Sequence, residues 1–287
     1  MHYNMILRRF IGGNSIYRAV KAPLANNVVP IFDFAKEGSL TQQQAIKYFK
    51  QVSHDIDVVA SYTTTNLKKP PAFAMKLSSV NMHSPDAMMS FIANKLITNN
   101  MSLFLDAESV TIDKDEQRII NNILKTFNDP RIYKTYQCYR KDTFDRLQRD
   151  IDNFENLGIK LVRGAYYEQD KYSGMLFTSK KDTDASYNKC INLVVNQMKH
   201  NKNLKMCIAS HNEYSINFTK EMIKASPELK NQISFAQLLG MSDHLTSTLA
   251  MNNYTVYKYV PYGNMYETLP YLTRRLIENY QILRYAL

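Results

Sequence analysis

The chain has 287 residues, 45% hydrophobic and 22% charged, which predicts a substantial buried core and excludes a disordered or collagen-like protein. Its 36 basic and 26 acidic residues leave a formal charge of +10. Because the basic residues are scattered, this charge suits an acidic membrane surface better than nucleic acid. No apolar run reaches the roughly 18 residues of a membrane span. The three cysteines form no CxxC pair, which argues against a disulfide framework or a zinc finger.

Short β-branched and aromatic runs alternate with longer amphipathic stretches along the chain. The predicted strands are 28–34, 73–77, 102–107, 132–138, 159–165, 205–210, 233–238 and 255–260. The predicted helices are 41–60, 85–97, 113–127, 142–157, 184–198, 214–225, 242–252 and 268–283. Strands that alternate with helices indicate right-handed crossovers and a parallel sheet, and eight such units favour a closed (β/α)8 barrel of the TIM type.

We find no internal repeat, low-complexity segment or Pro/Gly-rich linker, so we predict one domain over residues 1–287, with residues 1–9 as a flexible N-terminus. No acidic residue precedes Asp33, whereas Arg8, Arg9, Arg18 and Lys21 do. A basic start of this kind is typical of a mitochondrial presequence or of an ordinary basic first helix. We favour the helix, since the apolar pattern continues into the fold from about Phe10.

Polar residues fall at the ends of several predicted strands, where (β/α)8 barrels place their chemistry. They are Lys76, Asp106, Gln137, Lys160 with Arg163 and Gly164, Ser210 with His211, and Tyr259. Each alone is typical of a solvated rim, but together they predict a site at one end of the barrel. The glycines form neither GxGxxG nor GxxxxGK[ST], so a nucleotide would have to be held by cations and backbone amides.

The last predicted helix begins around Thr268 and Pro270 and contains Arg274, Arg275 and Glu278. One interpretation is a surface helix in which Glu278 pairs with either arginine. The other is a clamp of two guanidinium groups on a carboxylate, with Tyr271 forming a wall of the same pocket.

Eight segments together resemble the proline dehydrogenase family of flavoenzymes, and its eukaryotic branch more than its bacterial one. They are AMKLSS (74–79), FLDAE (104–108), TYQCY (135–139), KLVRGAYYE (160–168), DTDASY (182–187), ASHN (209–212), QLLGM (237–241) and YVPYGNMYETLPYLTRRLIEN (259–279). The resemblance implies a barrel that holds FAD, with the last helix over its mouth. It also implies oxidation of L-proline to 1-pyrroline-5-carboxylate by hydride transfer to flavin N5, with ubiquinone as the electron acceptor.

The resemblance assigns roles to individual residues. Lys76, Arg274 and Arg275 would pair with the proline carboxylate, and Tyr259, Tyr271 and Leu239 would line the substrate. Asp106 and Lys160 would be catalytic, Lys160 standing where bacterial relatives carry an arginine near flavin N5. The implied flavin contacts are Ala107, Gln137, Lys160, Val162, Arg163, Gly164, Ala165, Tyr166, Thr183, Ser210, His211 and Glu278. No metal is implied.

Two alternatives stay open at the level of sequence. One is a hydroxyproline dehydrogenase or a related cyclic imino acid oxidase; Tyr259 argues for proline, since the hydroxyproline-oxidising relatives tend to carry a smaller residue there. The other is a catalytically silent barrel that binds proline or a protein partner. For a eukaryotic protein the resemblance implies the matrix side of the mitochondrial inner membrane, with peripheral membrane contact, and otherwise the cytoplasm.

Overall fold

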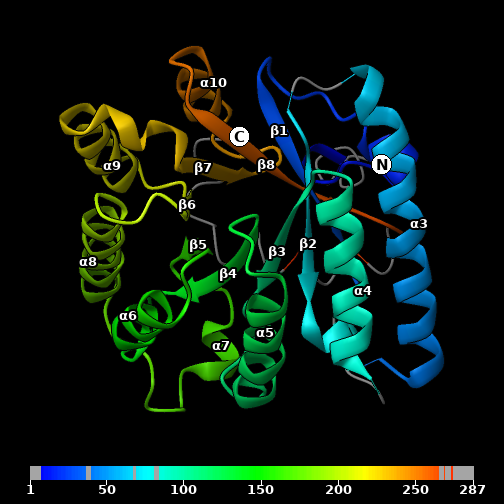
Figure 1. The fold of residues 1–287 in the computed structure, drawn as a ribbon, viewed down its shortest axis with the longest axis horizontal. Coiled ribbons are helices and arrows are strands. Elements are labelled where there is room, and N and C mark those ends of the chain that lie inside the picture. Colours follow the sequence, from blue (N-terminus) through cyan, green and yellow to red (C-terminus); the bar gives the residue numbers. More distant parts are fainter. Residues whose placement is uncertain are drawn as a thin grey trace. The chain divides into compact units, whose positions relative to one another are not determined.

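The computed structural model describes residues 8–36, 40–66, 69–80, 84–264, 268 and 273. Its strands form a closed parallel barrel in the order β1-β2-β3-β4-β5-β6-β7-β8, with helices between them (Figure 1), which confirms the predicted fold class. The strands are β1 (Val28–Phe34), β2 (Ala72–Lys76), β3 (Ser102–Asp106), β4 (Ile132–Gln137), β5 (Leu157–Val162), β6 (Leu204–Ala209), β7 (Ile233–Leu238) and β8 (Thr255–Tyr262).

The helical elements are η1 (Arg8–Phe10), α2 (Ile16–Ala19), α3 (Gln42–Asn66), η2 (Leu77–Val80), α4 (Pro85–Thr98), α5 (Asp113–Phe127), α6 (Thr143–Asn153), α7 (Tyr167–Asp170), α8 (Lys180–Met198), α9 (Glu213–Ala225), η3 (Pro227–Asn231) and α10 (Asp243–Met251). Among these described helices, not one combines the length and the hydrophobicity that crossing a bilayer requires. The chain divides into two compact units, which we call unit 1 (Met1–Leu103 with Ala236–Leu287) and unit 2 (Phe104–Phe235).

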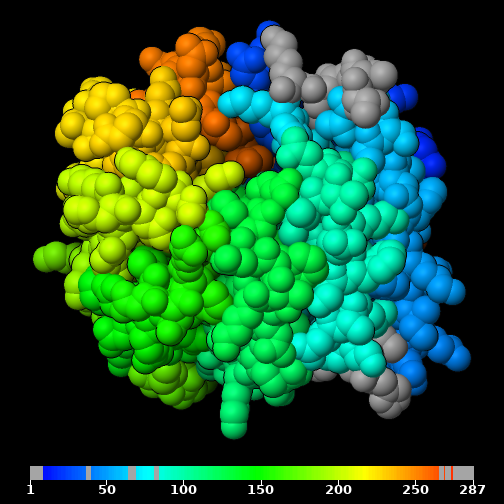
Figure 2. Space-filling view, viewed as in Figure 1, coloured from blue at the N-terminus to red at the C-terminus, as the bar shows by residue number. Residues whose placement is uncertain are grey.

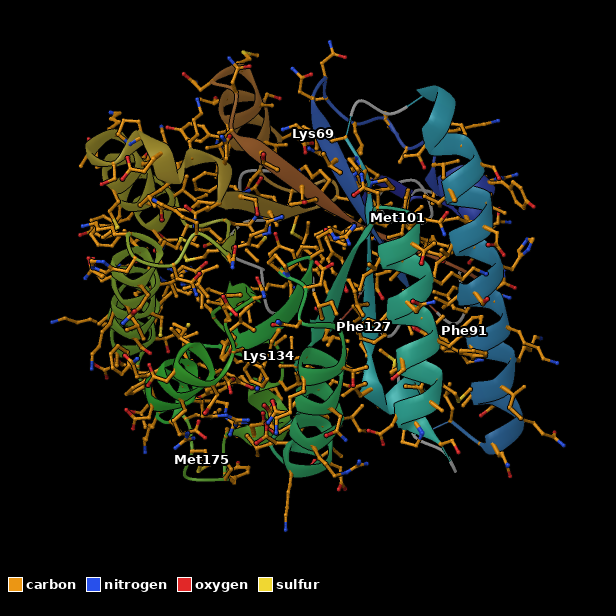
Figure 3. The ribbon with its side chains drawn as sticks, in the orientation of Figure 1. Lys69, Phe91, Met101, Phe127, Lys134 and Met175 are labelled. Carbon is orange, nitrogen blue, oxygen red and sulfur yellow. The ribbon has the colours of Figure 1, made fainter. Side chains whose placement is uncertain are left out.

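In unit 1, β1 lies between β2 and β8 and is parallel to both, with Ile31 beside Ala72 on one side and Tyr259 on the other. The strand is buried over almost its whole length, as expected of a strand covered on both faces. Helix α3 packs against α2 and α4, and Figure 1 shows α3 and α4 side by side. Phe49 and Phe91 join these two helices with ring centroids 5.5 Å apart, and Phe91 is labelled in Figure 3.

In unit 2, β5 lies between β4 and β6, and Lys160 is in register with Thr135 and Cys207. Helix α6 packs on β4 and α8, and α8 packs on β5, β6 and α9. On the face shown in Figure 2, α8 (yellow-green) and α9 (yellow) lie at the surface of this unit, as do the green segments that precede them in the chain. Helices therefore cover the strands of unit 2, and a loop follows the last residue of each strand.

Most predicted bounds agree with the structure to within two residues. Helix α3, however, continues to Asn66 instead of ending at 60, and α8 begins at Lys180 instead of 184. Of the predicted helix 268–283, only residues 268 and 273 are described. Strand β5 ends at Val162, so Arg163 and Gly164 follow the strand instead of belonging to it, because Gly164 adopts a φ of +140°. Strand β8 continues to Tyr262, which places Tyr259 inside it. Helix α6 ends at Asn153 and not at 157, because Phe154 is extended (φ −122°, ψ 116°). The short α7 was not predicted.

Gly158 marks a close approach of β5 to the chain before and at the start of β4. A Cβ atom on this glycine would lie 2.6 Å from the Ile132 carbonyl oxygen and 2.9 Å from that of Pro130. Both neighbours are backbone atoms, so they cannot move aside as a flexible side chain could. Any side chain here would force the two strands apart, and this is why the strand includes a residue type that is rare in strand interiors.

We expect Gly158→Ala to lower the free energy of unfolding by about 1–3 kcal/mol through overpacking against the backbone. Urea unfolding followed by far-UV circular dichroism measures this change. Lys202→Ala, at an exposed position, is the matched control and should stay within about 0.5 kcal/mol of the wild type. Equal stability of the Gly158 variant and the control would contradict the close approach.

Candidate active site

Asp106 and Lys160 form a buried ion pair in unit 2. Asp106 is the last residue of β3, and the Lys160 ammonium lies 2.6 Å from its Oδ1, with each side chain less than a tenth exposed (9% and 8%). The Thr135 hydroxyl donates to the same oxygen at 3.4 Å. The Lys160 Nζ also lies 5.8 Å from the centroid of the Phe104 ring. Burial in a low-dielectric environment strengthens the attraction between these charges and fixes both side chains in place.

Gln137, the last residue of β4, connects the loops that follow β3 and β5. Its Nε2 donates to the Glu108 carbonyl oxygen at 2.8 Å, and its Oε1 accepts from the Ala165 N–H at 3.1 Å. The Gln137 carbonyl in turn accepts from the Thr143 hydroxyl at 2.6 Å. With both ends of the amide engaged, the side chain fixes the segments that contain Ala107 and Ala165, two of the predicted flavin contacts.

Arg163 is held by side chains from three elements. Its Nε donates to Asp184 at 2.6 Å, one terminal nitrogen donates to Ser210 at 2.6 Å, and the other donates to Ser215 at 3.0 Å. Its guanidinium carbon lies 4.4 Å from the centroid of the Tyr187 ring. A planar guanidinium can satisfy all these partners at once, which an ammonium could not. The structure thus brings the predicted residues Arg163 and Ser210 together.

Sequence reasoning missed Asp184, Tyr187 and Ser215 as partners of Arg163. Burial alone would raise the pKa of Asp184, but hydrogen bonds from Lys180 and Arg163 outweigh it and lower that pKa. The residues Asp184 and Tyr187 stand inside the DTDASY segment. An aspartate and a tyrosine three positions apart on one helix face were therefore the available signal.

The remaining predicted contacts in unit 2 lie close to strand or helix ends. Val162 ends β5, Tyr166 is the buried residue before α7, and His211 follows Ser210 beyond β6. Thr183 lies in the first turn of α8 and its hydroxyl donates to the Ser179 carbonyl at 3.2 Å.

In unit 1, Lys76 is the last residue of β2 and is paired with Asp33 of β1. The Lys76 ammonium donates to both carboxylate oxygens, at 2.9 and 3.0 Å, and the two side chains are 2% and 1% exposed. Asp33 was missed, since a single acid within an apolar strand gives no spacing signal. Tyr259 and Leu239 also lie together, because the Leu239 N–H donates to the Tyr259 carbonyl at 3.0 Å. Tyr271, Arg274, Arg275 and Glu278 fall outside the described residues.

Glu116, in the first turn of α5, is a second acid of unit 2 that sequence reasoning missed. It is 4% exposed, and within the described part of the chain its Oε1 has no hydrogen-bond partner. Burial raises the pKa of Glu116 to about 10, and the neighbouring Glu108 adds to this effect. Glu116 is therefore protonated at neutral pH.

Comparisons with known proteins agree on one family. The family model described as proline dehydrogenase matches residues 18–284. Proline dehydrogenase 1, mitochondrial, of Bos taurus is 36% identical over 207 residues, which cover 69% of this chain and 35% of the bovine protein. The hydroxyproline dehydrogenase of Xenopus laevis is 32% identical over 238 residues, which cover 75% of this chain and 50% of the relative. The chain thus spans about a third to a half of these two relatives.

Solved structures show the same fold at low identity. Proline utilization A from Bdellovibrio bacteriovorus, inactivated by N-propargylglycine, superimposes with a TM-score of 0.88 at 18% identity, covering 96% of this chain and 33% of that protein. A mutant of Bradyrhizobium japonicum proline utilization A gives a TM-score of 0.79 at 21% identity, with 96% of this chain and 31% of that protein covered. The barrel is therefore shared with parts of much larger proteins.

The raised pKa of Glu116 predicts a pH-dependent contribution to stability. The pKa of Glu116 is 4.5 in the unfolded chain and about 10 in the folded protein. Between these two pH values the folded state therefore holds one more proton than the unfolded state. Its contribution then falls as pH rises, by up to about 1.4 kcal/mol per pH unit. We expect Glu116→Gln, which cannot ionise, to become more stable relative to the wild type between about pH 6 and pH 9.

Urea unfolding at several pH values measures this difference. Glu155→Gln, at an exposed position, is the control and should run parallel to the wild type. Parallel pH curves for the wild type and Glu116→Gln would show that Glu116 is ionised in the folded protein.

Proposed function

The chain belongs to the proline dehydrogenase family, and on this premise we propose that it oxidises L-proline to 1-pyrroline-5-carboxylate with FAD, the first step of proline breakdown. The observation that carries the proposal is the family match over residues 18–284, together with relatives at 36% identity. Five of the eight segments that resemble the family lie at the ends of β2 to β6, which supports the proposal.

The donor set of unit 2 fits FAD. Arg163 keeps 23% of its side chain exposed, and its charge beside the Ser210 hydroxyl suits phosphate oxygens. The backbone that follows β5 and the Gln137 amide offer further polar contacts. When bound, FAD would supply the hydride acceptor. The protein must then provide orientation and charge.

Lys160 is the residue best suited to stabilise negative charge that develops during hydride transfer. Its ammonium is buried and pre-positioned by Asp106, so little reorganisation is needed at the moment of reaction. We assign Asp106 the role of holding this ammonium and Thr135 a supporting hydrogen bond to Asp106. Neither a covalent nucleophile nor a metal is required for this chemistry.

We assign substrate binding to cations that contact the carboxylate of proline and to side chains that contact its ring. We assign the carboxylate of proline to Lys76, Arg274 and Arg275, and the pyrrolidine ring to Tyr259, Tyr271 and Leu239. The ion pair with Asp33 supports this assignment, because it offsets the cost of burying a lysine at the end of β2. A hydroxyproline dehydrogenase is the second candidate, favoured by relatives of that name at 32–34% identity. The bulk of the buried Tyr259 supports proline.

We further infer that the electrons pass to a quinone in a membrane. The formal charge of +10 supports peripheral contact with an anionic lipid surface. Relatives named mitochondrial support a mitochondrial location.

Reduction of the bound flavin by proline without oxygen tests the function directly. We expect purified protein loaded with FAD to show a band near about 450 nm that bleaches on addition of proline. Hydroxyproline and N-methylglycine are the controls and should bleach it more slowly. Faster bleaching by hydroxyproline would select the second candidate, whereas a flavin that no imino acid reduces would indicate a silent barrel.

We expect Arg275→Met and Lys76→Met to raise the KM for proline far more than they change the flavin content. Losing one charge from a buried carboxylate pair costs about 2–5 kcal/mol, so KM should rise at least about thirty-fold. Steady-state kinetics and the flavin-to-protein ratio measure the two effects. Arg149→Met, at an exposed position on α6, is the control; an unchanged KM in the Arg275 variant would remove that residue from the substrate site.

A further inference from the structure

Asp170, the last residue of α7, is a fully buried acid (0% exposed) in unit 2. Its Oδ1 accepts from the Ser109 hydroxyl at 2.6 Å and from the Val110 N–H at 3.2 Å, and its Oδ2 accepts from the Tyr139 hydroxyl at 2.8 Å. Among the described residues no lysine or arginine forms an ion pair with it. A buried carboxylate is tolerated only when such donors satisfy it, so the four groups are interdependent.

Tyr139, which is bonded to Asp170, also contacts the loop after β5. A Cβ atom on Gly164 would lie 2.2 Å from Cδ1 of the Tyr139 ring, and Gly164 has a φ of +140°. The Tyr139 N–H donates to the Arg163 carbonyl at 2.7 Å. Burial, together with the hydrogen bond to Asp170, raises the pKa of the Tyr139 hydroxyl, which therefore stays a donor. The ring thus packs directly on the backbone at Gly164.

Backbone hydrogen bonds also join Tyr139 and its neighbours to the segment between α7 and α8. Its carbonyl accepts from the Phe177 N–H at 2.8 Å, and the Lys141 N–H donates to the Met175 carbonyl at 2.9 Å. Figure 3 labels Met175 in the segment between α7 and α8. The chain on both sides of α7 is therefore tied to the segment that follows β4.

Two loops bond to this carboxylate directly, and a third is joined to it through Tyr139. Ser109 and Val110 lie just beyond Ala107 after β3, Tyr139 lies two residues beyond Gln137 after β4, and Gly164 lies after β5. Five of the flavin contacts assigned to unit 2 lie in these loops, namely Ala107, Arg163, Gly164, Ala165 and Tyr166. Asp170 lies further along the connection from β5 to α8, at the end of α7, and has no role in the proposed chemistry.

We propose that Asp170 is a positioning residue for the flavin: it holds the loops after β3, β4 and β5 in one fixed arrangement, through Ser109 and Val110 directly and through Tyr139 to Gly164. The inference rests on the proposed function, since it assumes that these loops hold FAD. Its physical basis is that a carboxylate offers two accepting oxygens, one for each side of the network, whereas an amide offers one.

Asp170→Asn and Tyr139→Phe test the inference in the full-length protein. The first keeps the shape of the side chain but removes one acceptor; the second keeps the ring on Gly164 and removes only the hydroxyl. We expect each to raise the Kd for FAD by about ten-fold or more and to change the visible circular dichroism of the bound flavin. Because both act on one hydrogen bond, the double variant should bind FAD no more weakly than the weaker single variant.

Amide hydrogen exchange without flavin gives an independent readout. We expect faster exchange at 107–110 and 163–165 in both variants, with the far-UV spectrum unchanged. Asp145→Asn, at an exposed position on α6, is the control and should match the wild type throughout.

The outcomes separate this inference from the proposed function. Variants that melt at a lower temperature but keep the wild-type Kd, flavin spectrum and local exchange would show a purely structural role and overturn the inference. If Asp170→Asn does not fold, Tyr139→Phe decides alone by the same criteria. A wild-type protein that binds no FAD would overturn the proposed function instead, whatever the exchange data show.

Discussion

Burying a positive charge beside apolar strands is unfavourable unless a negative charge accompanies it, and this constraint governs the candidate site. Lys160 is neutralised by Asp106 in unit 2, and Lys76 by Asp33 in unit 1. Each pair stands at or near the end of a strand, so the strand backbone fixes its position. Each ion pair therefore fixes its lysine in place before any ligand arrives, which is the arrangement that the role proposed for Lys160 requires.

The positive charge of Arg163, which is only partly buried, is balanced in a different way. Its Nε bonds to Asp184, each terminal nitrogen donates to one hydroxyl group, and the ring of Tyr187 packs against the guanidinium. The single nitrogen of a lysine does not present donors to α8, α9 and the residue after β6 in these three directions. Unit 2 thus contains two kinds of cation. Lys160 is a compact ammonium buried next to an acid, and Arg163 is a planar, partly exposed group suited to phosphate.

The barrel and its strands could be predicted because β-branched and aromatic runs recur with helical patterns between them, and β1 and β7 begin and end as predicted. The end of β5 could not, because it depends on the φ of Gly164 and on a ring packed against it. The candidate site was found through family segments, which point to residues that touch ligands. Asp33 and Asp170 act through other side chains and belong to no local pattern, so only the fold reveals them.

Glu116 has a consequence for how the protein exchanges protons with its surroundings. Its buried carboxyl is neutral in the folded state at pH 7, because its pKa is about 10, although the formal count of +10 treats it as ionised. At this carboxyl the native molecule holds a proton that the unfolded chain releases into the buffer. The heat absorbed during denaturation consequently includes the ionisation enthalpy of that buffer, so calorimetric traces in phosphate and in Tris will differ for a reason unrelated to packing.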